Sequence, residues 1–177
     1  MSRALMVIDV QNDFLPGGAL AVPDGDEVIE PINTLAADPA FDVVIATRDW
    51  HPADHSSFRA QGGPWPPHCV QGTPGAQLSA DLDTARIDVV IDKGTTIEAD
   101  GYSAFESDEL RTLVRTERIV AATIVGLTTD FCVLNTARDA LREGLTVTIE
   151  RAAVRGIDAD GAHRALEELA ALGARIS

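Results

Sequence analysis

Cys132 is a side chain of this sequence that could act as a nucleophile. It follows an apolar run, 119–125, that is typical of a buried strand; we expect Gly126 to end that strand and a helix to start just past Thr129 and Asp130. The first turn of a helix carries unpaired N–H groups and a partial positive charge, which favour a thiolate over a thiol. The alternative is that Cys132 is a small buried hydrophobic residue, the commonest state of a free cysteine.

Asp9 and Lys93 are the residues that could serve such a nucleophile. A thiol needs a base that takes its proton and donors that stabilise the oxyanion formed on attack. Asp9 could be the base if burial raises its pKa towards neutrality, and Lys93 could hold the acid and the thiolate in register. Taken singly, Asp9 could equally cap a turn, and Lys93 could be a solvated residue at a strand end. Their occurrence with Cys132 at three strand ends favours a catalytic group.

A second set of residues has the composition of a metal site. Asp49 and His51 stand two positions apart, so in an extended backbone they point to the same side. His55 and His68 follow, which places three of the four histidines in one loop of 18 residues. Mixed carboxylate and imidazole ligands suit one divalent metal ion such as Zn, Fe or Mn. The alternative is a loop of surface histidines, because an Asp-x-His pattern alone is a weak signal.

The elements that must position these residues alternate along the chain. Apolar runs predict strands at 4–10, 41–47, 87–92, 119–125 and 145–149, with a further edge strand at 174–176. Segments of helical spacing predict helices at 26–37, 107–116, 131–143 and 159–172. Strands that are apolar on both faces and alternate with helices predict an α/β fold, a three-layer α/β/α arrangement with a mainly parallel central sheet. We expect one domain over 1–177.

The polar residues fall at the carboxyl ends of the expected strands. Asp9 ends the first strand, Asp49 and His51 follow the second, Lys93 ends the third, and Cys132 follows the fourth. In open parallel sheets the ligand crevice lies outside these ends. The sequence therefore predicts that all of these side chains meet at one edge of the sheet. The Pro- and Gly-rich loop between the second and third strands is long, as functional loops often are.

Composition narrows the class of partner. The chain has 177 residues, 45% of them hydrophobic, and a formal net charge of -14, so nucleic acid and anionic membranes are poor partners. We expect a small-molecule substrate instead. The two cysteines form no CxxC pair and no apolar run approaches a membrane span, which fits a cytoplasmic protein. Whether it is a monomer or a homo-oligomer stays open.

Together these motifs closely resemble the nicotinamidase/pyrazinamidase branch of the isochorismatase-like cysteine hydrolases. The matching segments are 9–14, 48–52, 55–58, 65–73, 93–94, 102–105 and 126–133. The resemblance implies that Cys132 is the nucleophile, Asp9 the general base and Lys93 the third member of a triad. It also implies an oxyanion hole made by the backbone N–H groups of Thr128 and Cys132, and a cis peptide bond between Leu127 and Thr128.

The same resemblance assigns the metal and substrate residues. Asp49, His51 and His68 match the metal ligands. His55 matches a histidine that ligates the metal directly in some members and bonds a metal-bound water in others. Whether His55 is a direct ligand therefore stays open. The substrate-binding residues implied are the aromatic pair Phe14 and Trp65, which sandwich a pyridine ring, and Tyr102 in the pocket wall.

The activity implied is hydrolysis of nicotinamide to nicotinate and ammonia in NAD salvage, with pyrazinamide as a further substrate. One alternative is another amidase of the superfamily that acts on a carbamoyl or ureido substrate, which the pair Phe14 and Trp65 disfavours. Isochorismatase activity fits less well, because hydrolysis of a vinyl ether needs no thiolate. An alternative of another class is a receiver-like module that binds Mg and phosphate at Asp9 and Lys93, which leaves Cys132 unexplained.

Overall fold

The computed structural model describes residues 1–177 and contains one sheet of six parallel strands. The strands are β1 (Ser2–Ile8), β2 (Val43–Asp49), β3 (Val89–Lys93), β4 (Ile119–Leu127), β5 (Thr146–Arg155) and β6 (Arg175–Ile176). Their order across the sheet is β3-β2-β1-β4-β5-β6. The predicted parallel sheet is confirmed, including the short edge strand at its end.

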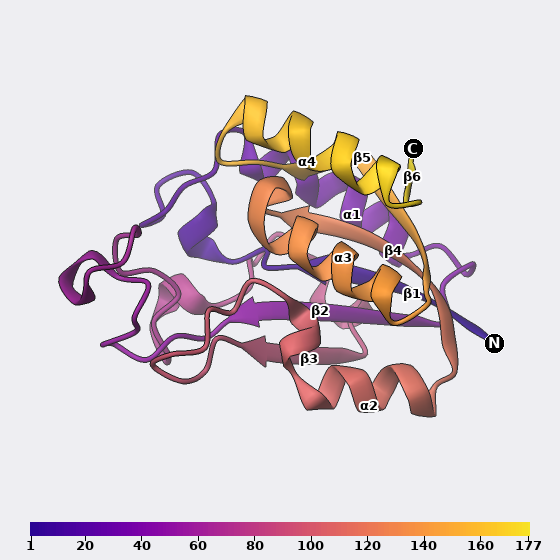
Figure 1. Cartoon of the computed structure of the whole chain (residues 1–177), viewed down its shortest axis with the longest axis horizontal. Helices are drawn as coiled ribbons and strands as arrows, with labels where there is room; N and C mark the ends of the chain where they lie inside the picture. The colour runs from indigo at the N-terminus through magenta and orange to yellow at the C-terminus, as the bar shows by residue number, and fades with distance from the viewer.

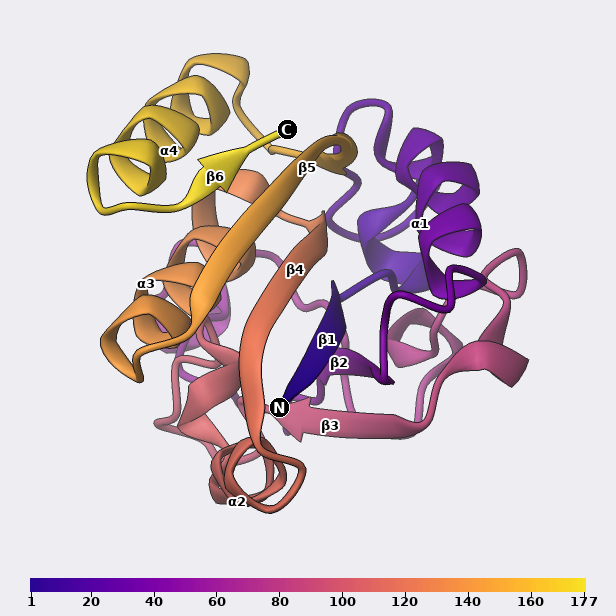
Figure 2. The same cartoon turned by 90° about the vertical axis from the view of Figure 1, so that its right-hand side faces the viewer.

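Four α-helices cover the sheet: α1 (Ile29–Ala36), α2 (Asp108–Thr116), α3 (Leu134–Arg142) and α4 (Ala159–Ala171). Helix α1 lies on one face, and α2, α3 and α4 lie on the other (Figure 2). Each face has its own buried hydrophobic cluster, one including Ile32 of α1 and the other Leu110 of α2 and Leu169 of α4. The predicted three-layer α/β/α arrangement is confirmed. None of the helices has the length and apolar character that crossing a bilayer requires.

Gly126 does not end its strand, contrary to our expectation. It lies inside β4 with a φ of +106°, opposite Ile8 of β1. A Cβ at this position would lie 2.1 Å from the carbonyl oxygen of Ile8, so only glycine lets the two strands approach this closely. The strand therefore continues to Leu127. The expected cis peptide bond between Leu127 and Thr128 is present.

Most predicted elements differ from the structure by no more than two residues at either end, and three differ by more. Strand β5 runs on to Arg155, because after an irregularity its last residues pair again with the end of β4. The helix expected from 26 starts as a 3₁₀ turn, and α1 begins only at Ile29. The helix expected from 131 starts as a π-helical turn over Thr129–Val133, and α3 begins at Leu134.

The strand order explains how residues far apart in the sequence meet. After β1 the chain packs α1 on one face of the sheet, whereas after β3 it returns through α2 on the other face to β4, beside β1. The point between β1 and β4 is thus a topological switch point, where α/β sheets bind their ligands. The loops that follow the strands gather at this end of the molecule, opposite the N-terminus (Figure 1).

Candidate active site and metal centre

Asp9 lies directly after β1, fully buried, in a left-handed backbone conformation with a φ of +50°. Such a conformation is costly for a residue other than glycine and persists where the surroundings hold it. Here Thr47 of β2 donates its hydroxyl to Asp9 Oδ1 at 2.6 Å, and Lys93 Nζ lies 2.7 Å from Asp9 Oδ2. Burial raises the pKa of Asp9 above its ordinary value, although Lys93 opposes the shift. The carboxylate can therefore hold a proton more readily than a surface aspartate.

Lys93, the last residue of β3, is 1% exposed. It contacts both the predicted catalytic residues and the predicted metal-binding residues. Its ammonium donates to Asp49 Oδ1 at 2.5 Å, to the carbonyl oxygen of Gly101 and to Cys132 Sγ at 3.4 Å. These three bonds use all three of its protons. Asp9 Oδ2 consequently forms an ion pair with Nζ at 2.7 Å without a well-aligned hydrogen bond. Burial lowers the pKa of Lys93, but the two aspartates outweigh it and keep the pKa well above its usual value.

Cys132 lies in the π-helical turn that follows β4 and is 4% exposed. Its Sγ is within 4.8 Å of the carboxylate oxygens of Asp9 and Asp49. The carbonyl of Thr128 accepts from the N–H groups of Phe131 at 3.1 Å and Val133 at 3.0 Å, which ties down the turn. The N–H of Thr128 donates to no carbonyl or side chain, and its buried hydroxyl has no partner either. One backbone donor beside the thiol is thus free for an oxyanion.

The thiol of Cys132 is not the preformed thiolate that its position in the chain suggested. Burial raises its pKa well above the ordinary value; Lys93 opposes this, and the carboxylates of Asp9 and Asp49 add to it. Burial, the largest cause, together with the two carboxylates outweighs the one ammonium. Cys132 therefore needs a base, and the carboxylate of Asp9, which lies within 4.8 Å of Sγ and has a raised pKa, can accept the proton.

Asp49, His51 and His68 form the second buried group, with their ligand atoms all within 4.8 Å of one another. The Nδ1–H of His51 donates to the carbonyl of Gly94 at 2.9 Å, and that of His68 to the carbonyl of Pro66 at 2.8 Å. These bonds fix both tautomers so that the two Nε2 lone pairs are the ones near Asp49 Oδ2, at 3.4 and 4.0 Å. Two fixed imidazoles and a carboxylate fit a divalent metal ion.

The charges of Asp49, His51 and His68 follow from their burial and from the charged groups around them. Burial opposes ionisation of Asp49, but Lys93 and His51 outweigh it and hold its pKa well below the usual range. Burial lowers the pKa of His68, which favours the neutral imidazole that binds metal. Burial acts likewise on His51, but the neighbouring carboxylate of Asp49 raises the pKa of His51 above the ordinary value. Asp49 is thus an anion facing two imidazoles.

His55 is fully buried but lies outside this group of ligand atoms. Its ring stacks on that of His51, with centroids 4.0 Å apart. The Nε2–H donates to the carbonyl of Ala99 at 2.7 Å, and Nδ1 accepts from the hydroxyl of Ser57 at 2.7 Å. Burial lowers its pKa. Both ring nitrogens are engaged, so His55 supports the ring of His51 in this structure.

Aromatic side chains stand around both groups. Phe14 is 3% exposed and lies 5.7 Å from the ring of His68. On another loop, the indole N–H of Trp65 donates to the hydroxyl of Tyr102 at 3.1 Å. Phe131, which we did not predict as a site residue, packs on both, with ring centroids 5.1 Å from Trp65 and 5.6 Å from Tyr102. Its position next to Cys132 is the signal that could have identified it.

Two further residues hold the acids and were not predicted. Gln11 donates to the carbonyl of Asp49 at 2.7 Å and accepts from its N–H at 2.8 Å, so one amide clamps the end of β2. Thr47, described above, bonds Asp9 from the neighbouring strand. Both are buried polar residues at strand ends, and this pattern was the available signal.

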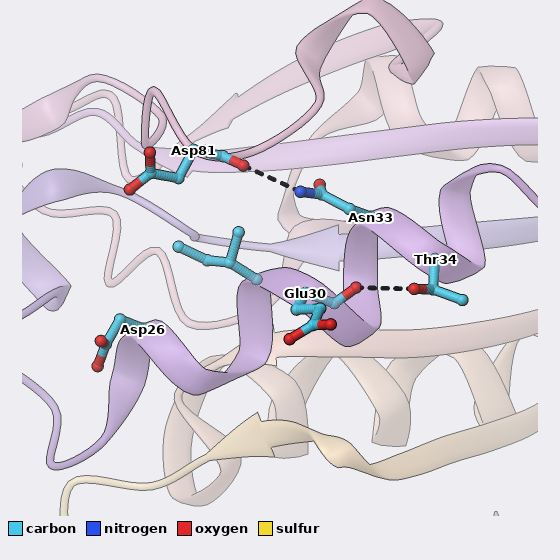
Figure 3. A pocket seen from close by; sticks show the side chains of 6 residues that line it. Asp26, Glu30, Asn33, Thr34 and Asp81 are labelled. Carbon is cyan, nitrogen blue, oxygen red and sulfur yellow. Dashed lines mark hydrogen bonds between the residues drawn. The ribbon is translucent and has the colours of Figure 1, made fainter.

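A groove of about 570 Å³ runs along α1 and is lined by none of these residues. Its walls are mostly acidic and polar (Figure 3). The side-chain amide of Asn33 donates to the backbone carbonyl of Asp81 at 2.9 Å. The hydroxyl of Thr34 donates to the backbone carbonyl of Glu30 at 3.1 Å. It offers no thiol, imidazole or cation, so it lacks the groups that Cys132, His51 and Lys93 bring together at the switch point.

Comparisons with known proteins agree with this geometry. An isochorismatase domain model matches residues 3–177. The chain is 42% identical over 176 residues to the nicotinamidase/pyrazinamidase of Mycobacterium tuberculosis, covering 94% of each chain. PnC1 of L. infantum in complex with nicotinate has a TM-score of 0.95 at 40% identity, over 99% of this chain and 92% of that one. The pyrazinamidase of Pyrococcus horikoshii in complex with zinc has a TM-score of 0.93 at 43% identity, over 100% and 99%.

Proposed function

The chain belongs to the isochorismatase family, and we propose that within it the protein is a nicotinamidase, which hydrolyses nicotinamide to nicotinate and ammonia and accepts pyrazinamide as well. The observation that carries this is the contact of Lys93 with Asp9, Asp49 and Cys132, which joins a nucleophile, a base and a metal group in one buried site. We place the reaction in NAD salvage. Since Cys69 and Cys132 are both free thiols, we place it in the cytoplasm.

The first step is transfer of the thiol proton. Cys132 holds its proton because burial and two carboxylates raise its pKa, and Asp9 has a raised pKa and lies within 4.8 Å of the thiol. Asp9 takes the proton, and the thiolate formed is stabilised by the ammonium of Lys93. Lys93 keeps its place because Asp49 and the carbonyl of Gly101 hold the other two N–H groups.

The second step is attack of the Cys132 sulfur on the carboxamide carbon. The negative charge moves to the carboxamide oxygen, where the backbone N–H groups of Thr128 and Cys132 receive it. The N–H of Thr128 is free for this purpose, whereas an occupied N–H would first have to lose its partner. One such donor contributes about 100- to 1,000-fold to the rate in comparable hydrolases.

The remaining steps return the proton and release the acid. Asp9 gives its proton to the leaving nitrogen, the C–N bond breaks, and ammonia departs from a thioester on Cys132. Asp9 then takes a proton from water, whose oxygen attacks the thioester carbon. The C–S bond breaks, nicotinic acid leaves and loses its proton to water as nicotinate, and Asp9 returns the proton it holds to the Cys132 thiolate. One buried carboxylate thus serves alternately as base and acid, for which its raised pKa is suited.

Asp49, His51 and His68 would hold one divalent metal ion, and we propose zinc from the zinc-bound pyrazinamidase neighbour. When bound, such an ion supplies a Lewis-acidic contact for the ring nitrogen of the substrate. We assign His55 to supporting His51 rather than to direct ligation. These residues orient the substrate, while the proton transfers are made by Asp9 and Cys132.

Phe14, Trp65 and Tyr102 form the substrate-binding walls in this proposal. Flat aromatic faces suit a heteroaromatic ring and offer little to a ureido chain. The bond between Trp65 and Tyr102 holds two of these walls at a set separation. The proposal therefore favours pyridine and pyrazine carboxamides over small aliphatic amides.

The test of this function is ammonia release from nicotinamide, pyrazinamide and a set of carbamoyl and ureido compounds, with and without prior alkylation by iodoacetamide. We expect turnover of the two aromatic amides only, abolished by alkylation. Hydrolysis of a ureido compound in preference to nicotinamide would identify another amidase of the superfamily. No hydrolysis of any amide would refute the proposal.

Removal of one imidazole should release the metal. We expect His51→Ala to lower the affinity for zinc by more than about 100-fold, since even groups behind a ligand are worth 10- to 100-fold. The KM for nicotinamide should rise as well. Elemental analysis after dialysis and steady-state kinetics measure the two effects. His163→Ala is the matched control, because His163 is exposed on α4. This variant should keep one metal ion per chain. A full equivalent of metal in His51→Ala would refute the ligand assignment.

A further inference from the structure

The loop of residues 94–101 supplies three carbonyl groups to the site. The carbonyl of Gly94 accepts from Nδ1 of His51 at 2.9 Å. The carbonyl of Gly101 accepts from Lys93 Nζ. Between them, the carbonyl of Ala99 accepts from His55 at 2.7 Å. The position of this one loop therefore sets both the metal group and the triad.

The two ends of this loop pack against each other and against a metal ligand. Gly94 and Gly101 have φ values of +60° and +76°. A Cβ on Gly94 would lie 2.5 Å from Cε1 of His51, and a Cβ on Gly101 would lie 2.9 Å from the Cα of Gly94. Neither glycine has a side chain with which to hold its place, so another group must fix them.

Glu106 is the group that holds both ends. Its Oε2 accepts from the N–H of Gly94 and its Oε1 from the N–H of Gly101, each at 3.2 Å. Each glycine thus bonds Glu106 through its N–H and a site residue through its carbonyl. The turn that carries Glu106 is itself anchored, because the N–H of Ala104 donates to the buried hydroxyl of Thr136 on α3 at 3.0 Å.

We propose that Glu106 is a positioning residue for the hydrolysis. Its carboxylate bonds only the N–H groups of Gly94 and Gly101, and it acts on His51 and Lys93 at once through the carbonyls of these two glycines. One carboxylate outside the site thereby keeps the metal ligand and the triad cation in mutual register. The proposal rests on the proposed function for its kinetic consequence, whereas its consequence for metal binding does not.

The decisive variant is Glu106→Gln, which keeps the size of the side chain but replaces one acceptor oxygen by an NH₂ group. That group cannot accept from an amide N–H, so one end of the loop is released. We expect zinc affinity, measured by competition with a chromophoric chelator, to fall about 10- to 100-fold. At saturating zinc and nicotinamide we expect kcat to fall at least tenfold with KM changed less. Alkylation of Cys132 by iodoacetamide, followed by mass spectrometry, should change in rate because Lys93 shifts.

Glu98→Gln is the matched control, since Glu98 is exposed in the same loop, makes no hydrogen bond or ion pair, and loses the same charge. It should leave all three quantities within about twofold. Glu106→Asp, which shortens the side chain by one methylene, is measured in parallel and should fall between wild type and Glu106→Gln. A Glu106→Gln protein that is merely less stable to heat, with zinc affinity and alkylation rate unchanged, would overturn the proposal.

The same measurements separate this inference from the proposed function. Zinc affinity and alkylation are measured without substrate. If the wild-type protein does not hydrolyse nicotinamide, the proposed function fails, yet the comparison of Glu106→Gln with Glu98→Gln still decides the role of Glu106. If zinc affinity falls and the alkylation rate does not change, the claimed link between the two groups is wrong.

Discussion

We expect Cys132→Ala to abolish the turnover of nicotinamide while substrate and metal still bind. No other thiol can replace it, because Cys69 is completely buried on the loop that follows β2 and its thiol forms no hydrogen bond with Asp9 or Lys93. Loss of a nucleophile in comparable hydrolases lowers kcat by 10⁴-fold or more. Cys132 is not among the residues proposed to bind the metal or the substrate ring, so the binding of both should persist.

The measurements are ammonia release, binding of nicotinamide by calorimetry, and mass spectrometry of acid-quenched reactions. Wild-type protein should show a nicotinoyl thioester on Cys132, and the variant should show none. Cys69→Ala is the matched control and should keep most of the activity. Turnover by Cys132→Ala within tenfold of wild type would rule out covalent catalysis.

The second large effect is expected for Lys93→Met, which keeps the length of the side chain and removes its charge. Asp9 and Asp49 would then be buried without the ammonium that lies 2.7 and 2.5 Å from them. Breaking a buried ion pair from one side costs about 3–5 kcal/mol, which for a chain of this size lowers the Tm by roughly 6–20 °C. Activity should be lost too, because the thiolate loses its cation.

The measurement is thermal unfolding in the presence of a chelator, so that no metal ion offsets the charge of Asp49. The double variant Asp9→Asn/Lys93→Met has one buried charge fewer, and we expect it to recover part of the lost stability without any activity. This outcome would separate the electrostatic cost from loss of packing. A double variant no more stable than Lys93→Met would show that the buried charge of Asp9 is not the cause.

The convergence of the site residues was predictable from sequence because it follows from a general rule. Parallel strands end at one edge of a sheet, so Asp9, Asp49 and Lys93 had to meet there. The protonation of Cys132 was not predictable in the same way. It depends on the sum of burial, two carboxylates and one ammonium at specific distances, and only the fold supplies those distances.

Other features escaped prediction because their causes lie far away in the chain. We interpreted Gly126 as the end of a strand. Only the structure shows that Ile8 approaches so closely that the interior of the strand needs a glycine at this position. The engagement of His55 depends on the carbonyl of Ala99 in a loop that follows another strand. No motif identified Glu106, because its role depends on hydrogen bonds from two backbone N–H groups, which no sequence pattern predicts.

The burial of Lys93 has a practical consequence for handling the protein. It is the only lysine in the chain, and it is 1% exposed. An amine-selective reagent therefore meets no accessible lysine side chain in the folded protein. The Lys93 amine becomes reachable only when the loops around the site open or the protein unfolds. Modification of Lys93 by an activated ester, located by mass spectrometry, thus reports opening of the site.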